Sequence, residues 1–181
     1  MIVLIILLFC ILASLGVGAL AAWSDVKTLR IPNCYSLIVM VLFALAYSAA
    51  YLGGVHLQIF MPLKIHILTM VVVFILTYVM FYFGVLGGGD SKLLTAFSLW
   101  VGLKGALALL FYMSLAGFVL GVFALFLKKK TPFKPKNKEG WIARTQNGEN
   151  KLPYAVAIFV GVLASYAVLG YISLDTFVSL L

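Results

Sequence analysis

The chain has 181 residues, of which 65% are hydrophobic and only 10% are charged. Soluble domains usually carry about 25% charged residues, so this composition excludes an ordinary soluble fold. The formal net charge is +8, but the basic residues lie between apolar segments, as they do in loops that orient membrane proteins. We therefore expect a single membrane-embedded domain over residues 1–181, in contact with the lipid bilayer and with no nucleic acid partner.

Apolar runs long enough to cross a hydrocarbon core of about 30 Å recur along the chain. They predict an all-α, polytopic bundle of about six transmembrane helices. Residues 93–126 would exceed about 45 Å as one helix, and Gly102, Lys104 and Gly105 predict a break within them. Trp100, before this break, is expected to anchor a helix end at the membrane interface. The expected segments are residues 2–22, 35–52, 63–83, 91–101, 106–127 and 152–172.

The basic residues indicate on which side each loop lies. Lys27, Arg30 and Lys92 follow the first and third segments, and eight basic residues with two acids lie between positions 128 and 151. With six segments all of these fall on one side, which the positive-inside rule makes cytoplasmic. With five segments, residues 128–151 would lie on the opposite side of the membrane from Lys27. We therefore expect six segments and interpret residues 128–151 as a basic, solvated cytoplasmic loop.

The acidic residues are the first candidates for chemistry, and there are five: Asp25, Asp90, Asp175, Glu139 and Glu149. Glu139 and Glu149 lie in the polar loop and Asp175 in the outer C-terminal tail, where a solvated charge is a sufficient explanation. Asp25 and Asp90 each follow an odd-numbered segment, so both are expected at the cytoplasmic boundary of the bilayer. Ionisable groups there are costly and often functional. Two structural alternatives stay open, because Asp90 could cap a helix and Asp25 could begin a turn.

Three glycines, Gly87, Gly88 and Gly89, come directly before Asp90. Consecutive glycines allow unusual backbone angles and let another chain approach the backbone closely. A peptidase must hold its substrate strand beside a carboxylate, so we expect Gly87 and Gly89 to contact substrate. A flexible turn is the alternative, although it needs fewer glycines.

The sequence offers no ligand set for a metal. Cys10 and Cys34 form no CxxC pair, and His56 and His66 have neither a cysteine nor a carboxylate beside them. Structural zinc takes four such ligands. We therefore expect no metal and no cofactor, and interpret these residues as packing residues.

Three blocks of the sequence resemble the type IV prepilin peptidase family, in the order in which that family has them. Residues 87–90 (GGGD) match its GxGD motif, and residues 91–94 (SKLL) look like the continuation. Residues 23–33 (WSDVKTLRIPN) resemble its first catalytic block, with an Asp, a basic pair and Pro-Asn. Residues 151–155 (KLPYA) resemble the motif at the start of its last helix.

The resemblance implies a membrane aspartyl endopeptidase that removes the short cytoplasmic leader of prepilins, with Asp25 and Asp90 as its catalytic pair. Its substrate would be a prepilin or pilin-like protein with one membrane helix, cleaved after a Gly that precedes this helix. The implied location is the cytoplasmic (inner) membrane of a bacterium or archaeon, with the active site at the cytoplasmic face. Longer members carry a zinc-binding domain and methylate the new N-terminus. Without that domain the chain resembles the short form of Flp/Tad pili, and we expect no methylation.

Two close carboxylates suggest the mechanism. Their charges repel, so the pair is expected to share one proton at working pH. The ionised member would accept a proton from water while the other donates to the scissile carbonyl. Which of Asp25 and Asp90 is the base stays open, because the proton belongs to the pair. Lys27 and Lys92 are expected to orient the substrate chain or to contact lipid head groups.

Three other functions fit parts of this pattern. A related GxGD peptidase could act on another membrane substrate, such as a preflagellin. A non-enzymatic transporter or channel would also have six helices, two acids and glycine breaks, but it predicts acids near the midplane of the membrane. An inert assembly factor is the third.

Overall fold

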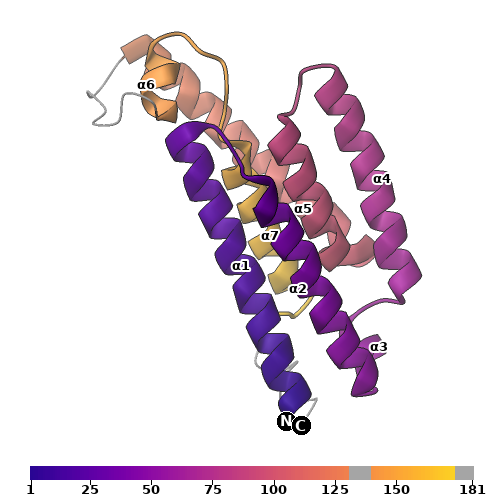
Figure 1. The fold of residues 1–181 in the computed structure, drawn as a ribbon. Coiled ribbons are helices and arrows are strands. Elements are labelled where there is room, and N and C mark those ends of the chain that lie inside the picture. The colour runs from indigo at the N-terminus through magenta and orange to yellow at the C-terminus, as the bar shows by residue number, and fades with distance from the viewer. Residues whose placement is uncertain (131–139, 174–181) are drawn as a thin grey trace.

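The computed structural model describes residues 1–130 and 140–173, and these residues form helices and no strand (Figure 1). Four helices, α1, α2, α4 and α5, are long and apolar enough to cross a membrane, and α7 is a shorter apolar helix. The predicted all-α, multi-pass membrane fold is therefore confirmed. The helices are α1 (Ile2–Thr28), α2 (Asn33–Leu52), α3 (His56–Ile59), α4 (Leu63–Tyr82), α5 (Gly88–Lys130), α6 (Trp141–Gln146) and α7 (Tyr154–Val168).

Helices form because a hydrocarbon core offers no water to the backbone, whose polar groups must then bond within the segment. Prolines fix where three of these helices begin: Pro32, Pro62 and Pro153 each directly precede a helix. Proline is tolerated there because its missing N–H would have no partner inside the helix. The predicted starts of the second and third segments are correct to within two residues.

The first helix is longer than expected. It continues six residues past the predicted end, to Thr28, because residues 23–28 contain neither Pro nor Gly to stop it. Leu29 ends it in a left-handed conformation (φ 53°, ψ 37°), and its N–H donates to the Asp25 carbonyl at 2.8 Å. Asp25 therefore lies inside the last turns of a helix, where its side chain has a fixed direction, and does not begin a turn.

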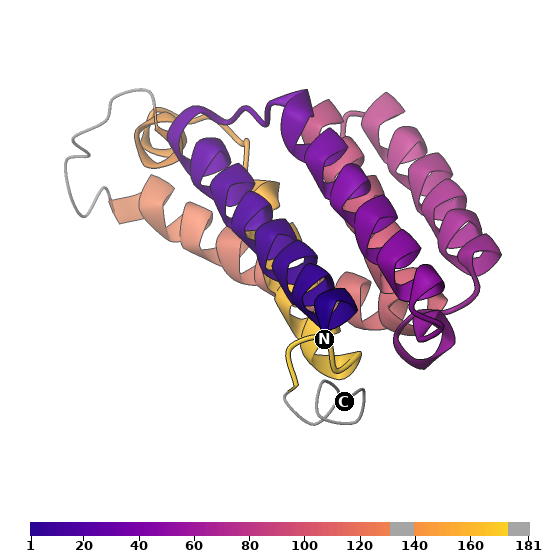
Figure 2. The same cartoon turned by 60° about the horizontal axis from the view of Figure 1, so that its bottom comes forward.

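The break in the long apolar stretch falls at Gly102. This residue has φ 55° and ψ −166°, and α5 folds back on itself there (Figures 1 and 2). Residues 88–101 extend about 21 Å and residues 103–130 about 42 Å. A Cβ at Gly102 would lie 3.0 Å from the His66 ring, so both the conformation and the space require glycine. The predicted short segment followed by a full one is confirmed, although the turn between them is a single residue.

The core lies where the first half of α5 meets α1, α2 and α7, with α4 along one side. His66 is buried and joins two backbone segments, since its Nε2 accepts the Met61 N–H at 3.1 Å and its Nδ1 lies 2.7 Å from the Leu99 carbonyl oxygen. Trp100 is fully buried beside it and donates its Nε1–H to the Val39 carbonyl at 2.9 Å. The expectation of an interfacial Trp100 was therefore wrong, because the indole finds its polar partner inside the bundle.

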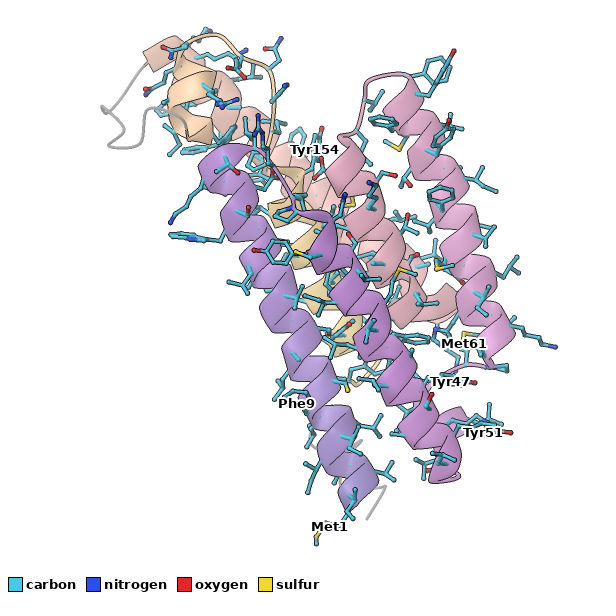
Figure 3. The ribbon with its side chains drawn as sticks, viewed as in Figure 1. Met1, Phe9, Tyr47, Tyr51, Met61 and Tyr154 are labelled. Carbon is cyan, nitrogen blue, oxygen red and sulfur yellow. The ribbon has the colours of Figure 1, made fainter. Side chains whose placement is uncertain are left out.

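Most of the polar segments of the chain lie at one end of the bundle. The end of α1, the start of α2, both ends of α5, α6 and the start of α7 lie there, at the top of Figure 1. We call it the basic end. Tyr154 lies toward it, whereas Met1, Tyr51 and Met61 lie toward the other end (Figure 3). The α4 helix packs mainly against α5, reaches the Phe43 and Tyr47 rings of α2 through His66, and stands at the edge of the bundle (Figure 2).

Part of the predicted solvated loop is folded. Residues 141–146 form α6, whose Trp141 is buried against Ala124 and Leu127 at the end of α5. The loop prediction was wrong for these residues, because Trp141 and Ile142 give the short helix an apolar face. Glu139, in the same predicted loop, and Asp175 in the C-terminal tail lie outside the described residues.

The arrangement predicts which loops a membrane-impermeant thiol reagent reaches in intact cells. In a cysteine-free background, Lys27→Cys, Lys92→Cys and Arg144→Cys should label only after the membrane is permeabilised, because the positive-inside rule predicts that the basic end faces the cytoplasm. Gly54→Cys and Lys104→Cys should label without permeabilisation. Labelling of Arg144→Cys in intact cells would contradict the fold-back at Gly102.

Candidate active site

A cleft of about 500 Å³ opens at the basic end of the bundle. Both predicted acids line it, Asp25 from the end of α1 and Asp90 from the start of α5. Their residues are only 4% and 8% exposed, so the carboxyl groups are enclosed by protein and accessible only through this cleft. The other lining residues are Leu29, Arg30, Ile31, Pro32, Asn33, Gly87, Gly88 and Gly89.

Asp25 is held by the start of α7. Its Oδ2 accepts a hydrogen bond from the Ala155 N–H at 3.1 Å. The amides in the first turn of a helix have no partner within that helix, so the Ala155 amide is free to bind a carboxylate, and the helix dipole favours negative charge there. This contact gives a physical role to the block at residues 151–155. The residue identities gave no sign of it, because the donor is a backbone group.

Asp90 is less satisfied than Asp25. It is the third residue of α5, so it lies inside the first turn and does not cap the helix. The Gly87 backbone interacts with its carboxyl group, and the charge of Asp25 is close enough to act on it. Its Oδ1 is buried and has no hydrogen-bond partner among the described residues. Such an oxygen in a native structure calls for an explanation, and it belongs to a residue that lines the cleft.

The glycines before Asp90 serve close packing. None of the three is among the glycines with positive φ, so the left-handed conformation that glycine allows is not adopted at these positions. A Cβ at Gly87 would lie 2.5 Å from Asp90 Oδ2, and one at Gly89 would lie 3.0 Å from Ile31 Cβ and 3.4 Å from the Ile31 carbonyl oxygen. The neighbours described here are the chain's own Asp90 and Ile31, so the expected contact of Gly87 and Gly89 with substrate stays a prediction.

The segment from Leu29 to Asn33 forms the other wall of the cleft and is fixed by polar contacts. Ser24 Oγ donates to the Arg30 carbonyl at 2.9 Å, and Lys92 Nζ donates to Asn33 Oδ1 at 3.0 Å. Leu29 keeps the left-handed conformation described above, which is strained for a residue with a Cβ. Strained positions are found where the surroundings hold them in place, often at functional sites.

The two lysines predicted to bind substrate do not line the cleft. Lys92 reaches its edge through Asn33, and Lys27 Nζ lies 4.5 Å from the centre of the exposed Trp23 ring. Their expected contact with substrate or head groups stays a prediction. Glu149 lies away from the carboxylates and is 3.9 Å from Arg144.

The cleft can support chemistry that needs two carboxylates. Among the residues that line it, Asp25 and Asp90 are the acids and no His or Cys accompanies them. No group of three or more His, Cys, Asp or Glu side chains capable of holding a metal occurs in the described ranges 1–130 and 140–173. A carboxyl pair of this kind can divide proton acceptance and donation between its members.

Fold and cleft together define a multi-pass membrane protein with a paired-carboxylate site. The model of the type IV leader peptidase family matches residues 2–122, about two thirds of the chain, including both carboxylates and all three glycines. The chain therefore belongs to the type IV leader peptidase family, and it is a membrane peptidase. Comparisons with curated proteins and with solved structures found no match.

The contacts of the three glycines predict how strongly each alanine substitution lowers peptidase activity. Gly87→Ala should fold but lower peptidase activity on the order of 100-fold, because its methyl group displaces the Asp90 carboxylate from its position. Gly89→Ala should also be impaired, since it pushes Ile31 and the cleft wall away. Gly88→Ala is the matched control: its methyl group meets the half-exposed Phe81 ring at 3.3 Å, and this ring can move. Equal activity of all three variants in membranes would contradict this account of the glycines.

Proposed function

We propose that the protein is an aspartyl endopeptidase that removes the cytoplasmic leader of type IV prepilins, in the short Flp/Tad-like form of the family. One observation carries the proposal: Asp25 and Asp90, 65 positions apart in the sequence, line one cleft beside the glycines of the GGGD block. Membership of the leader peptidase family supports proteolysis as the reaction.

In the proposed reaction one carboxylate accepts a proton and the other carboxyl group donates one. Buried like charges repel, so the pair binds one proton between them. The ionised carboxylate takes a proton from water, the hydroxide adds to the scissile carbonyl carbon, and the protonated carboxyl donates to the carbonyl oxygen. The tetrahedral intermediate collapses as the carboxyl group that took the water proton donates it to the leaving amide nitrogen, the other carboxylate takes a proton back from the hydroxyl group, and the C–N bond breaks. The Ala155 amide occupies Asp25 Oδ2, so Asp25 takes part in proton transfer through its other oxygen, whichever carboxylate is the base.

The place of the site agrees with a leader substrate. The positive-inside rule puts the basic end, and with it the cleft, at the cytoplasmic face of the membrane. A prepilin leader precedes a membrane helix on that face, so its scissile bond would reach the cleft without crossing the bilayer. A transporter, by contrast, binds its substrate near the midplane, whereas Asp25 and Asp90 lie within a turn of their helix ends.

A preflagellin is the main alternative substrate, and its hydrolysis would use the same carboxylates. Co-expression with candidate prepilins and preflagellins decides between them, with cleavage detected by mass spectrometry of the new N-terminus. Cleavage of a preflagellin but of no prepilin would replace the proposed substrate and leave the chemistry in place.

Replacement of either carboxylate tests the pair. Asp25→Asn and Asp90→Asn should each lower leader cleavage by about 100-fold or more, because an amide can neither accept nor share the proton. Both proteins should insert normally and still bind prepilin, since the substitution is nearly isosteric. Asp175→Asn is the matched control, because it makes the same substitution at an acid of the C-terminal tail that has no part in the proposed reaction, and it should cleave normally. Substantial cleavage by either purified, correctly inserted Asp→Asn protein would exclude the shared-proton pair.

Chelation tests the alternative of a metal-dependent peptidase. Water in the proposed reaction is activated by a carboxylate, so purified protein should cleave prepilin at the same rate with and without EDTA. The measurement is the fraction of substrate cleaved after dialysis against the chelator. Loss of activity that returns on addition of zinc would refute the aspartyl mechanism.

A further inference from the structure

A second and larger cavity, of about 670 Å³, lies beside the cleft and has no part in the mechanism above. It is a groove between the end of α4, the second half of α5 and residues 149–154. Two of its lining residues adjoin the carboxylate site in the chain. Leu86 directly precedes Gly87 of the cleft, and Tyr154 directly precedes Ala155, whose amide binds Asp25.

The floor of the groove is made of small residues along one face of α5. Ser114, Gly117, Gly121 and Ala124 line it and follow one another at intervals of three or four positions, so they share a face of the helix. Glycines spaced four apart in a membrane helix allow the backbone of a second helix to approach closely. The spacing by itself does not show that a second helix binds here.

Packing within the chain does not explain these glycines. Among the described residues, a Cβ at Gly121 would meet only Leu152, at 4.0 Å, and one at Gly117 would have its nearest neighbour, Tyr154, at 3.8 Å. Gly161 is different, because a Cβ there would lie 2.6 Å from the Leu109 carbonyl oxygen. Gly161 is therefore required by the bundle itself, whereas Gly117 and Gly121 keep a surface open in the groove.

The two ends of the groove differ in polarity. From Met113 to Lys128 it follows about 22 Å of helix, and its charged residues, Lys128 and Glu149, lie at the basic end. Lys128 is fixed there by Gly148 and Asn150, to which its Nζ donates. An occupant that fits is apolar along the membrane and becomes polar toward the basic end, where the cleft with Asp25 and Asp90 also lies. A membrane helix that follows a polar segment has this form, whereas a lipid chain gains nothing from a glycine floor.

We propose that this groove binds the membrane-spanning helix of the substrate, packed against Gly117 and Gly121. The chain that precedes the helix then passes Leu86 and Tyr154 and enters the cleft between the carboxylates. The groove thus sets the distance between the membrane helix and the cleaved bond. This inference rests on the proposed function, because it assumes that the substrate has such a helix.

The first test fills the groove and uses a defined reporter, which has a leader ending in Gly, an apolar helix of about 20 residues and a tag, co-expressed with the full-length protein. Gly121→Leu should lower reporter cleavage at least tenfold, because a displaced helix misplaces the scissile bond. Gly16→Leu is the matched control, since Gly16 is exposed on α1 and a Cβ there meets nothing within 4 Å. Gly121→Ala, whose methyl group fits, should cleave normally.

The second test locates the substrate helix directly and does not depend on Gly121→Leu folding. The reporter carries one cysteine in its helix, and the peptidase carries Asp90→Asn in a cysteine-free background, so that the complex persists. Oxidation should cross-link the reporter to Ser114→Cys and not to Leu115→Cys, its neighbour at the same depth, which is half exposed and does not line the groove.

The outcomes separate the two proposals. If the unchanged protein does not cleave the reporter or any candidate prepilin, the proposed function fails and this inference fails with it. If the unchanged protein cleaves but Gly121→Leu cleaves equally well, or if Leu115→Cys cross-links as strongly as Ser114→Cys, the groove is not the substrate site and the proposed function stands. Cross-linking at Ser114→Cys alone, with loss of cleavage in Gly121→Leu, supports the inference.

Discussion

The hydrogen bond between the Ala155 amide and Asp25 is the interaction on which the site depends. A buried carboxylate without a partner is costly, and so is an unpaired amide at a buried helix start. Each group satisfies the other at 3.1 Å, and the contact joins residues 130 positions apart in the chain. Once α1 and α7 are joined in this way, Asp25 has one fixed position, and the first turn of α5 brings Asp90 to the same cleft.

The wall of the cleft is held from outside the membrane bundle. Leu29, in its strained conformation, packs with the apolar cluster of Leu127 and Trp141, so α6 and the end of α5 support the segment that faces the carboxylates. On the other side Lys92 holds Asn33. The cleft is therefore lined by two segments that are far apart in sequence, residues 25–33 and 87–90, and its wall is supported by α6 and the end of α5.

The sequence was sufficient for the features that depend on apolar length and on local chemistry. Apolar runs predicted the long helices, Gly102 predicted the fold-back, and charge placed Asp25 and Asp90 at one end of the bundle. The sequence was insufficient where tertiary contacts determine the environment of a residue. Nothing local distinguishes a buried Trp100 from an interfacial one, because the difference is the Val39 carbonyl that accepts its N–H. The backbone donor at Ala155 and the packing of α6 are also invisible in residue identities, since both arise only when distant segments meet.

The shortness of the first half of α5 is possible because protein surrounds it. Residues 88–101 extend about 21 Å, about 9 Å less than an average hydrocarbon core. From Ser91 to Val101 every residue except Lys92 is buried inside the bundle, so neighbouring helices and not lipid cover this segment. A helix that lipid does not touch has no need to match the thickness of the bilayer. The first turn of α5 can therefore lie at the depth that brings Asp90 into the cleft with Asp25.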